Sequence, residues 1–147
     1  MNWKSAYLET RILSASPLGL VNILYEHAIL EVREARRHLA DGDVAARSRS
    51  VSKAIAIVGE LRGSLDRDAG GEIAANLARL YQYMLGRLTA GNVQQSDAPL
   101  AEVGRLLESL GDAWREIDTV SSPWLISPAG AIPLGEAPPS AMGGWSV

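Results

Sequence analysis

The sequence predicts an all-α protein, an antiparallel up-down-up-down four-helix bundle, on the strength of three observations. No proline occurs between Pro17 and Pro99, so helices can run through this stretch without interruption. Four segments carry apolar residues at three- and four-residue spacing, which is typical of helices with one buried face. The turns that join these segments are short, so neighbouring helices should run antiparallel.

The first two helices are expected at about residues 17–40 and 44–65. Ser16 is a suitable N-cap with Pro17 in the first helical position, and Asp43 can cap the second helix. The first helix is expected to bury a row made of Val21, Leu24, Ala28, Val32, Ala35 and Leu39. In the second helix the expected row is Val44, Val51, Ile55, Val58 and Leu65.

The third and fourth helices are expected at about residues 71–92 and 98–117. Gly91 suits a left-handed turn at the end of the third helix, and Pro99 fits the first turn of the fourth, after Asp97. The third helix is expected to bury Ile73, Leu77, Leu80, Met84 and Leu88. The fourth is expected to bury Leu100, Val103, Leu107, Leu110, Trp114 and Ile117.

Each helix also carries apolar residues outside its predicted core row. They are Leu20, Ile23, Leu30, Ala54, Ile57, Leu61, Ala74, Tyr81, Tyr83, Leu85, Leu106 and Ala113. One interpretation is a broad core face, because a bundle helix that contacts two neighbours buries two rows. The other is a surface groove that accepts amphipathic helices of a partner. The sequence leaves both open.

The two ends of the chain differ from its body. Five of the seven prolines lie beyond Val120, where Glu136 is the one charged residue. We expect residues 1–120 to form a bundle domain that includes an N-terminal cap segment, 1–16, and we expect 121–147 to be a flexible tail. The cap segment either straps the end of the bundle or covers a groove until a partner arrives. The Trp124-Leu125-Ile126 cluster of the tail is idle, straps the bundle or is a docking motif.

The composition argues against several classes of function. A net charge of −3 gives no basic surface for nucleic acid, and the absence of cysteine excludes disulfides and thiolate nucleophiles. Neither His27 nor His38 has a glutamate three residues before it, as a di-iron bundle requires. Arg36, Arg37, Arg47 and Arg49 are interpreted as a solvated face. We therefore expect a binding protein rather than an enzyme, without metal or cofactor.

The chain contains no apolar run long enough for a secretory signal or for insertion into a membrane. A cytoplasmic location is therefore expected.

Several short strings, taken in order over residues 7–118, resemble the FliS family of flagellin-specific export chaperones. Each string alone is weak, but the ordered set at suitable spacing is fairly specific. The tail does not belong to the family pattern. The strings are Thr10–Tyr25 with Ser14-Ala15-Ser16-Pro17, Gly42-Asp43, Lys53-Ala54-Ile55, Glu60-Leu61, Ser64-Leu65-Asp66, Gly70-Gly71-Glu72-Ile73-Ala74, Asn76-Leu77, Leu80-Tyr81-Gln82-Tyr83, Arg87-Leu88, Asn92, Leu106-Leu107, Leu110 and Asp112-Ala113-Trp114.

This resemblance implies a cytoplasmic four-helix bundle that holds the C-terminal segment of unpolymerised flagellin. Binding would prevent premature filament assembly and keep the client competent for type III flagellar export, with the export apparatus as a further partner. Matching positions imply that five residues line or support the client-binding grooves: Ile55, Leu61, Leu77, Leu80 and Tyr81. The family's cap region matches the segment that contains Tyr7, Ile12 and Leu13.

A structural bundle without a client is the alternative interpretation, in which the extra apolar rows are buried in a homodimer. The free chaperone can itself be a monomer or a homodimer. A flagellin peptide should change the oligomeric state of a chaperone and leave that of a structural bundle unchanged. The substitutions Leu61→Asp and Tyr81→Asp are expected to weaken client binding while a helical fold remains.

Overall fold

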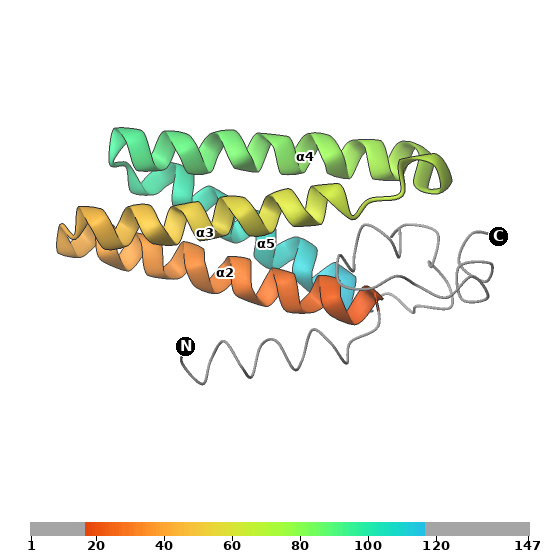
Figure 1. Cartoon of the computed structure of the whole chain (residues 1–147), viewed down its shortest axis with the longest axis horizontal. Helices are drawn as coiled ribbons and strands as arrows, with labels where there is room; N and C mark the ends of the chain where they lie inside the picture. Colours follow the sequence, from red (N-terminus) through yellow and green to blue (C-terminus); the bar gives the residue numbers. More distant parts are fainter. Residues whose placement is uncertain (1–16, 117–147) are drawn as a thin grey trace.

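The computed structural model describes residues 17–116, which form four helices in an antiparallel bundle. The helices are α2 (Pro17–Asp41), α3 (Val44–Gly63), α4 (Arg67–Gln94) and α5 (Asp97–Glu116), and consecutive helices run in opposite directions (Figure 1). The predicted fold class is therefore confirmed. The proposed N-cap Ser16, the core residue Ile117, the cap segment with Tyr7, Ile12 and Leu13, and the tail 121–147 lie outside the described residues.

Aspartate side chains start two of the helices. The carboxylate of Asp43 accepts a hydrogen bond from the backbone N–H of Ala46 at 3.1 Å, and Asp66 does the same for Ala69 at 3.0 Å. Each bond satisfies a backbone donor that the first turn of a helix leaves unpaired. The predicted cap of α3 is confirmed, whereas the cap at Asp66 starts α4 earlier than residue 71.

The early start of α4 is possible because Gly71 interrupts the helix without ending it. Its backbone has φ 55° and ψ −131°, a combination that is open to glycine and strained for other residues. One helical turn precedes this kink, and the helix continues after it to Gln94. Gly71 therefore separates a first turn, capped by Asp66, from the long helix, which begins close to the predicted residue 71.

The core lies along the axis of the bundle and is mostly aliphatic, with a group of three aromatic residues at one place. Tyr25 of α2 and Tyr81 of α4 meet with their hydroxyl oxygens 2.6 Å apart, although neither is exposed by more than 1%. Their rings pack edge to face, and Tyr25 packs in the same way on Trp114 of α5. This cluster joins helices that are not consecutive in the sequence.

Two predicted core residues are wrong: Val44 is 53% exposed and Ile73 is 52% exposed. Val44 is the first residue of α3, at the end of the bundle, and the helix first becomes buried at Ala46. In the first half of α4 the buried row is Ala74, Ala78 and Tyr81, one position further along the sequence than predicted, whereas the predicted Met84 and Leu88 are buried. At the start of this helix the small residues Ala74 and Ala78 are the buried ones, because they allow close approach to the neighbouring helices.

Arg47 was predicted on a solvated face, and this is also wrong, because it is only 4% exposed. Its guanidinium donates to the side-chain oxygen of Asn92 at 2.9 Å and to the backbone carbonyl of the same residue at 3.3 Å. The hydroxyl of Ser48 lies 3.4 Å from the same side-chain oxygen. These contacts satisfy the buried charge and attach the start of α3 to the end of α4.

None of the four described helices is long and apolar enough to cross a membrane. Within residues 17–116, no group of three or more histidine, aspartate or glutamate side chains is placed to hold a metal ion.

Candidate functional site

The five residues predicted to line or support grooves fall into two groups. Leu61 and Tyr81 are 1% exposed and belong to the core, so they offer no surface to a partner. Ile55, Leu77 and Leu80 are half-buried and pack against the core from outside. The expectation that aspartate at Leu61 or Tyr81 would leave the fold intact does not agree with this burial.

The three half-buried residues lie on different sides of α4. Residues seven apart lie on the same side of an α-helix, after almost two full turns. Ile55 is seven residues after Ser48, whose hydroxyl contacts α4, so Ile55 lies at the seam between α3 and α4. Leu80 is seven residues before Arg87, which contacts Glu102 of α5, so Leu80 lies at the seam between α4 and α5.

An apolar surface follows the seam between α4 and α5. Ile73 lies seven residues before Leu80 on the same side of α4, and both Leu77 and Leu80 are half-buried. On α5, half-buried leucines follow Glu102 at four-residue spacing, toward the same seam. We call this surface the α4–α5 strip, and it consists of Ile73, Leu77, Leu80, Leu106 and Leu110.

A polar cluster closes one end of the α4–α5 strip. Glu102 of α5 accepts hydrogen bonds from the Tyr83 hydroxyl and from the Arg87 guanidinium, each at 2.7 Å. The bonds from Tyr83 and Arg87 lower the pKa of Glu102, so its carboxylate stays ionised to a lower pH than that of a free glutamate. The same carboxylate raises the pKa of Tyr83. The strip therefore has an ionic end at Glu102 and an apolar end at Ile73.

A second apolar surface lies between α2 and α3. It is a groove of about 340 Å³ with Ile23, Leu24, Ala56 and Ile57 in its lining and with His27, Glu31 and Lys53 beside them. Ile23 and Ile57 are among the residues that the sequence marks as apolar beyond the core row. Apolar residues in excess of the core row thus indicate an apolar surface between helices, but the sequence does not show between which helices that surface lies.

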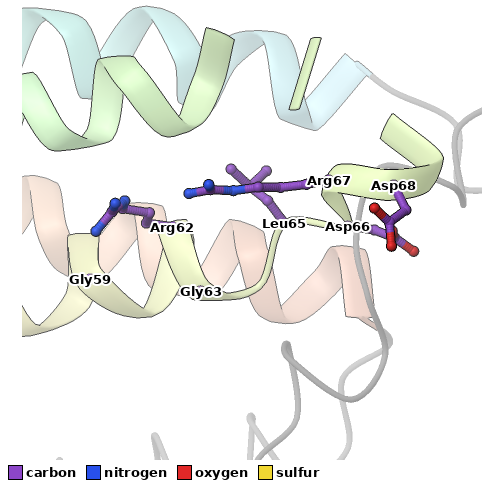
Figure 2. Close-up of a pocket in the computed structure, with 7 residues that line it drawn as sticks. All are labelled: Gly59, Arg62, Gly63, Leu65, Asp66, Arg67 and Asp68. Atoms are coloured by element: carbon purple, nitrogen blue, oxygen red, sulfur yellow. The ribbon is translucent and has the colours of Figure 1, made fainter. Parts of the chain in front are cut away.

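A polar cavity of about 570 Å³ lies at the turn between α3 and α4 (Figure 2). The side chains of Arg62 and Arg67 extend in the same direction there, and the lining also contains Asp66 and Asp68. Since the two positive and two negative charges balance, the cavity has no strong preference for an ionic ligand. Asp66 is in addition occupied as the N-cap of α4.

The chemistry of these surfaces is that of binding. Half-buried aliphatic side chains can bury the apolar face of a helix or an extended segment, but they move no protons and attack no bond. The strip and the groove lie on opposite sides of the bundle axis, because α4 and α5 form one seam and α2 and α3 the other (Figure 1). A partner that contacts both must therefore pass around the bundle.

Comparison with known proteins gives a consistent result. A family model described as "Flagellar protein FliS" matches residues 1–121. The chain is 39% identical over 116 residues to the flagellar secretion chaperone FliS of Salmonella typhimurium, an alignment that covers 78% of this chain and 86% of that protein. It is 34% identical over 120 residues to the FliS of Escherichia coli, with 81% and 87% covered. Against the flagellar secretion chaperone FliSB of Pseudomonas aeruginosa the identity is 32% over 112 residues, with 76% and 89% covered.

Proposed function

This chain belongs to the FliS family, and from that premise we propose that it is a flagellar secretion chaperone that binds the C-terminal segment of flagellin before flagellin polymerises. Binding covers the apolar faces of that segment, so that filament assembly cannot begin early. It also keeps flagellin competent for type III flagellar export. The chaperone acts in the cytoplasm as a stoichiometric partner and not as an enzyme.

The observation that carries the proposal is apolar surface outside the core on two separate seams. Ile73 is 52% exposed, and the other members of the α4–α5 strip are half-buried, as Ile57 is in the α2–α3 groove. Exposed apolar surface of this kind supports a binding role, because a solitary bundle gains nothing from keeping it in water. The names of the relatives indicate which kind of partner it serves.

We assign different roles to the five residues carried over from the family. Leu77 and Leu80 contact the client directly within the α4–α5 strip, and Ile55 contributes from the seam on the other side of α4. Leu61 and Tyr81 support these surfaces from the core, where they set the position of the helices. The client adopts helical structure on binding, which costs part of the gross interaction energy.

Titration calorimetry with the C-terminal segment of flagellin from the same organism tests the proposal. We expect one-to-one binding with a negative heat-capacity change, because apolar surface becomes buried. Replacing Leu80 with aspartate should weaken binding by about tenfold or more, since the charge must be desolvated against the client. Leu30→Asp is a matched control, because Leu30 is 44% exposed on α2 and lies outside the strip.

Absence of heat with the wild-type chain, confirmed by a second method such as native mass spectrometry, would contradict the proposal. Equal weakening by Leu80→Asp and Leu30→Asp would show that the strip is not the site.

The alternative of a self-associating bundle makes an opposite prediction for light scattering coupled to size exclusion. A chaperone changes its mass by one client when the flagellin peptide is added, and any homodimer of the free form gives way to that complex. A structural bundle keeps its mass at every peptide concentration. In that case the α4–α5 strip would be the dimer interface, and Leu80→Asp would yield monomers.

A further inference from the structure

Residues 122–147 lie outside the span that matches the family, and they contain an apolar cluster, Trp124-Leu125-Ile126. We propose that this cluster docks on the α4–α5 strip of its own bundle and competes with the client for it. The competitive part rests on the proposed function, whereas the docking part does not. Docking of the cluster would then lower the apparent affinity of the strip for a client.

The end of α5 places the cluster within reach of the strip. Glu116 lies at the end of the bundle where α2 begins and where α3 turns into α4 (Figure 1). Ile73 is six residues into α4 from that end, about 9 Å along the helix axis. Seven residues lie between Glu116 and Trp124, and the eight steps from one to the other span about 26 Å in an extended chain. The chain can therefore leave α5, turn back and reach the strip.

The charge distribution around α5 selects this seam over the other one. On the side of α2, Arg33 pairs with Glu108 at 2.8 Å and Arg36 pairs with Asp97 at 2.8 Å. On the side of α4, α5 presents Leu106 and Leu110, and the ion pair of Arg87 with Glu102 lies at the far end of the strip from Ile73. The tail carries no lysine or arginine and one acidic residue, Glu136, so it has little to offer an ion-paired seam. Its apolar cluster suits the α4–α5 strip.

The residues around the cluster also suit a docking segment. Pro123 fixes its own φ, and Pro128 biases Ser127, the residue before it, toward extended backbone, so the cluster lies between two restricted positions. If the cluster docks as an extended segment, the side chains of Trp124 and Ile126 point to the same side and contact the strip together. The restricted positions on both sides of the cluster reduce the entropy that docking costs.

Docking within one chain lowers the apparent affinity of the client by the fraction of molecules in which the strip is free. A tail that covers the strip nine-tenths of the time would weaken client binding by about tenfold. The effect needs no contact between the tail and the client.

Cysteine cross-linking tests the docking step without any client. The chain has no cysteine, so a pair of introduced cysteines reacts only with each other. In the full chain with Ile126→Cys and Ile73→Cys, we expect a disulfide to form at least about tenfold faster than with Ile126→Cys and Leu30→Cys. Leu30 is a suitable control because it is similarly exposed, at 44% against 52%, and lines the ion-paired side of α5. Equal rates for the two pairs would overturn the proposal.

Calorimetry with the flagellin segment tests the competition. The full chain with Trp124, Leu125 and Ile126 all replaced by alanine should bind the client several-fold more tightly than the wild-type chain. A control in which Ile132 and Leu134 are replaced by alanine, also in the tail, should bind as the wild type does. Selective cross-linking together with unchanged client affinity would refute the competition, and no binding by any variant would refute the proposed function instead.

Discussion

At the scale of single residues, the hydroxyl contact between Tyr25 and Tyr81 is the feature that most clearly distinguishes this core from an aliphatic one. Both side chains are almost fully buried, and their hydroxyls hydrogen-bond to each other at 2.6 Å, with Trp114 close to both. A buried hydroxyl without a partner destabilises the folded state, whereas two apolar side chains in the same place need none. The two hydroxyls together therefore stabilise the folded state by more than the sum of what each would contribute alone.

This leads to a double-mutant cycle as the first prediction. Tyr25→Phe and Tyr81→Phe should each lower the free energy of unfolding by about 1–3 kcal/mol, because the remaining buried hydroxyl loses its tyrosine partner. The double variant should cost no more than one of the single variants. Urea unfolding of the four proteins measures the coupling, and strictly additive losses would show that the two hydroxyls do not depend on each other.

The same pair predicts a loss of stability at alkaline pH. Burial raises the pKa of Tyr81 to about 12, although hydrogen bonds from Tyr25 and Trp114 oppose the shift, and burial also raises the pKa of Tyr25. In the unfolded chain tyrosine titrates near pH 10, so the unfolded state releases its protons first. The contribution of the two buried, protonated hydroxyls to the free energy of unfolding is therefore complete below about pH 10. It declines as the pH rises toward about 12.

Denaturant unfolding between pH 8 and pH 11 measures this decline, and Tyr25→Phe combined with Tyr81→Phe serves as the control. That double variant keeps the exposed Tyr83, so any difference in slope from the wild type belongs to the buried pair. Parallel slopes for the two proteins would mean that the buried hydroxyls do not titrate with unfolding.

At the scale of whole helices, α4 shows how close approach between elements depends on glycine. A Cβ atom added to Gly91 would lie 2.8 Å from Cδ2 and 2.9 Å from Cγ of Leu100, a residue that is itself fully buried. The same addition at Gly86, on the same helix, would meet nothing within 4 Å. The beginning of α5 can therefore pack directly against the backbone of α4 near its end.

The two glycines give a matched pair of alanine substitutions. Gly91→Ala should destabilise the protein by about 1–3 kcal/mol, since Leu100 has no free space into which to move. Gly86→Ala should stabilise it by about 0.5–1 kcal/mol, because alanine restricts the unfolded chain and adds no clash. Thermal unfolding of both variants measures these two changes in stability. The prediction fails if the two melting temperatures shift in the same direction.

Much of the element level could be predicted from the sequence, because spacing and capping act locally. Asp43 was identified as a cap, and four helices were expected in the order in which they occur. The orientation of α4 could not be derived in the same way, since Ile73 and Ala74 are adjacent and both fit an apolar row. Packing against the neighbouring helices buries Ala74 and leaves Ile73 exposed. For the same reason the sequence did not separate Leu61 and Tyr81 from Leu77 and Leu80.

At the scale of the whole molecule, core and binding surface are made of the same kinds of residue at the same spacing. The half-buried Leu80 is the direct neighbour of the fully buried Tyr81, and only Leu80 belongs to the surface that we propose for client binding. The difference is visible only once the four helices are packed. It predicts that folding and client binding can be altered independently.

The independent alteration can be tested with one substitution of each kind. Leu61→Asp places a charge in the core and should abolish the cooperative unfolding transition or lower the free energy of unfolding by more than about 4 kcal/mol. Ile73→Asp changes a residue that is 52% exposed and should shift that free energy by less than about 1 kcal/mol while client binding weakens. Circular dichroism in urea, together with calorimetry, measures both properties. A folded Leu61→Asp variant with normal stability would contradict the assignment of Leu61 to the core.

The tyrosine pair also constrains how the sequence can change over generations. A lineage that replaces one tyrosine with phenylalanine must pass through a less stable ancestor, whereas a second replacement restores a matched core. Substitutions at positions 25 and 81 should therefore occur together among related sequences, although the positions are 56 residues apart. Along a family tree, one of the two tyrosines on its own should be a short-lived state.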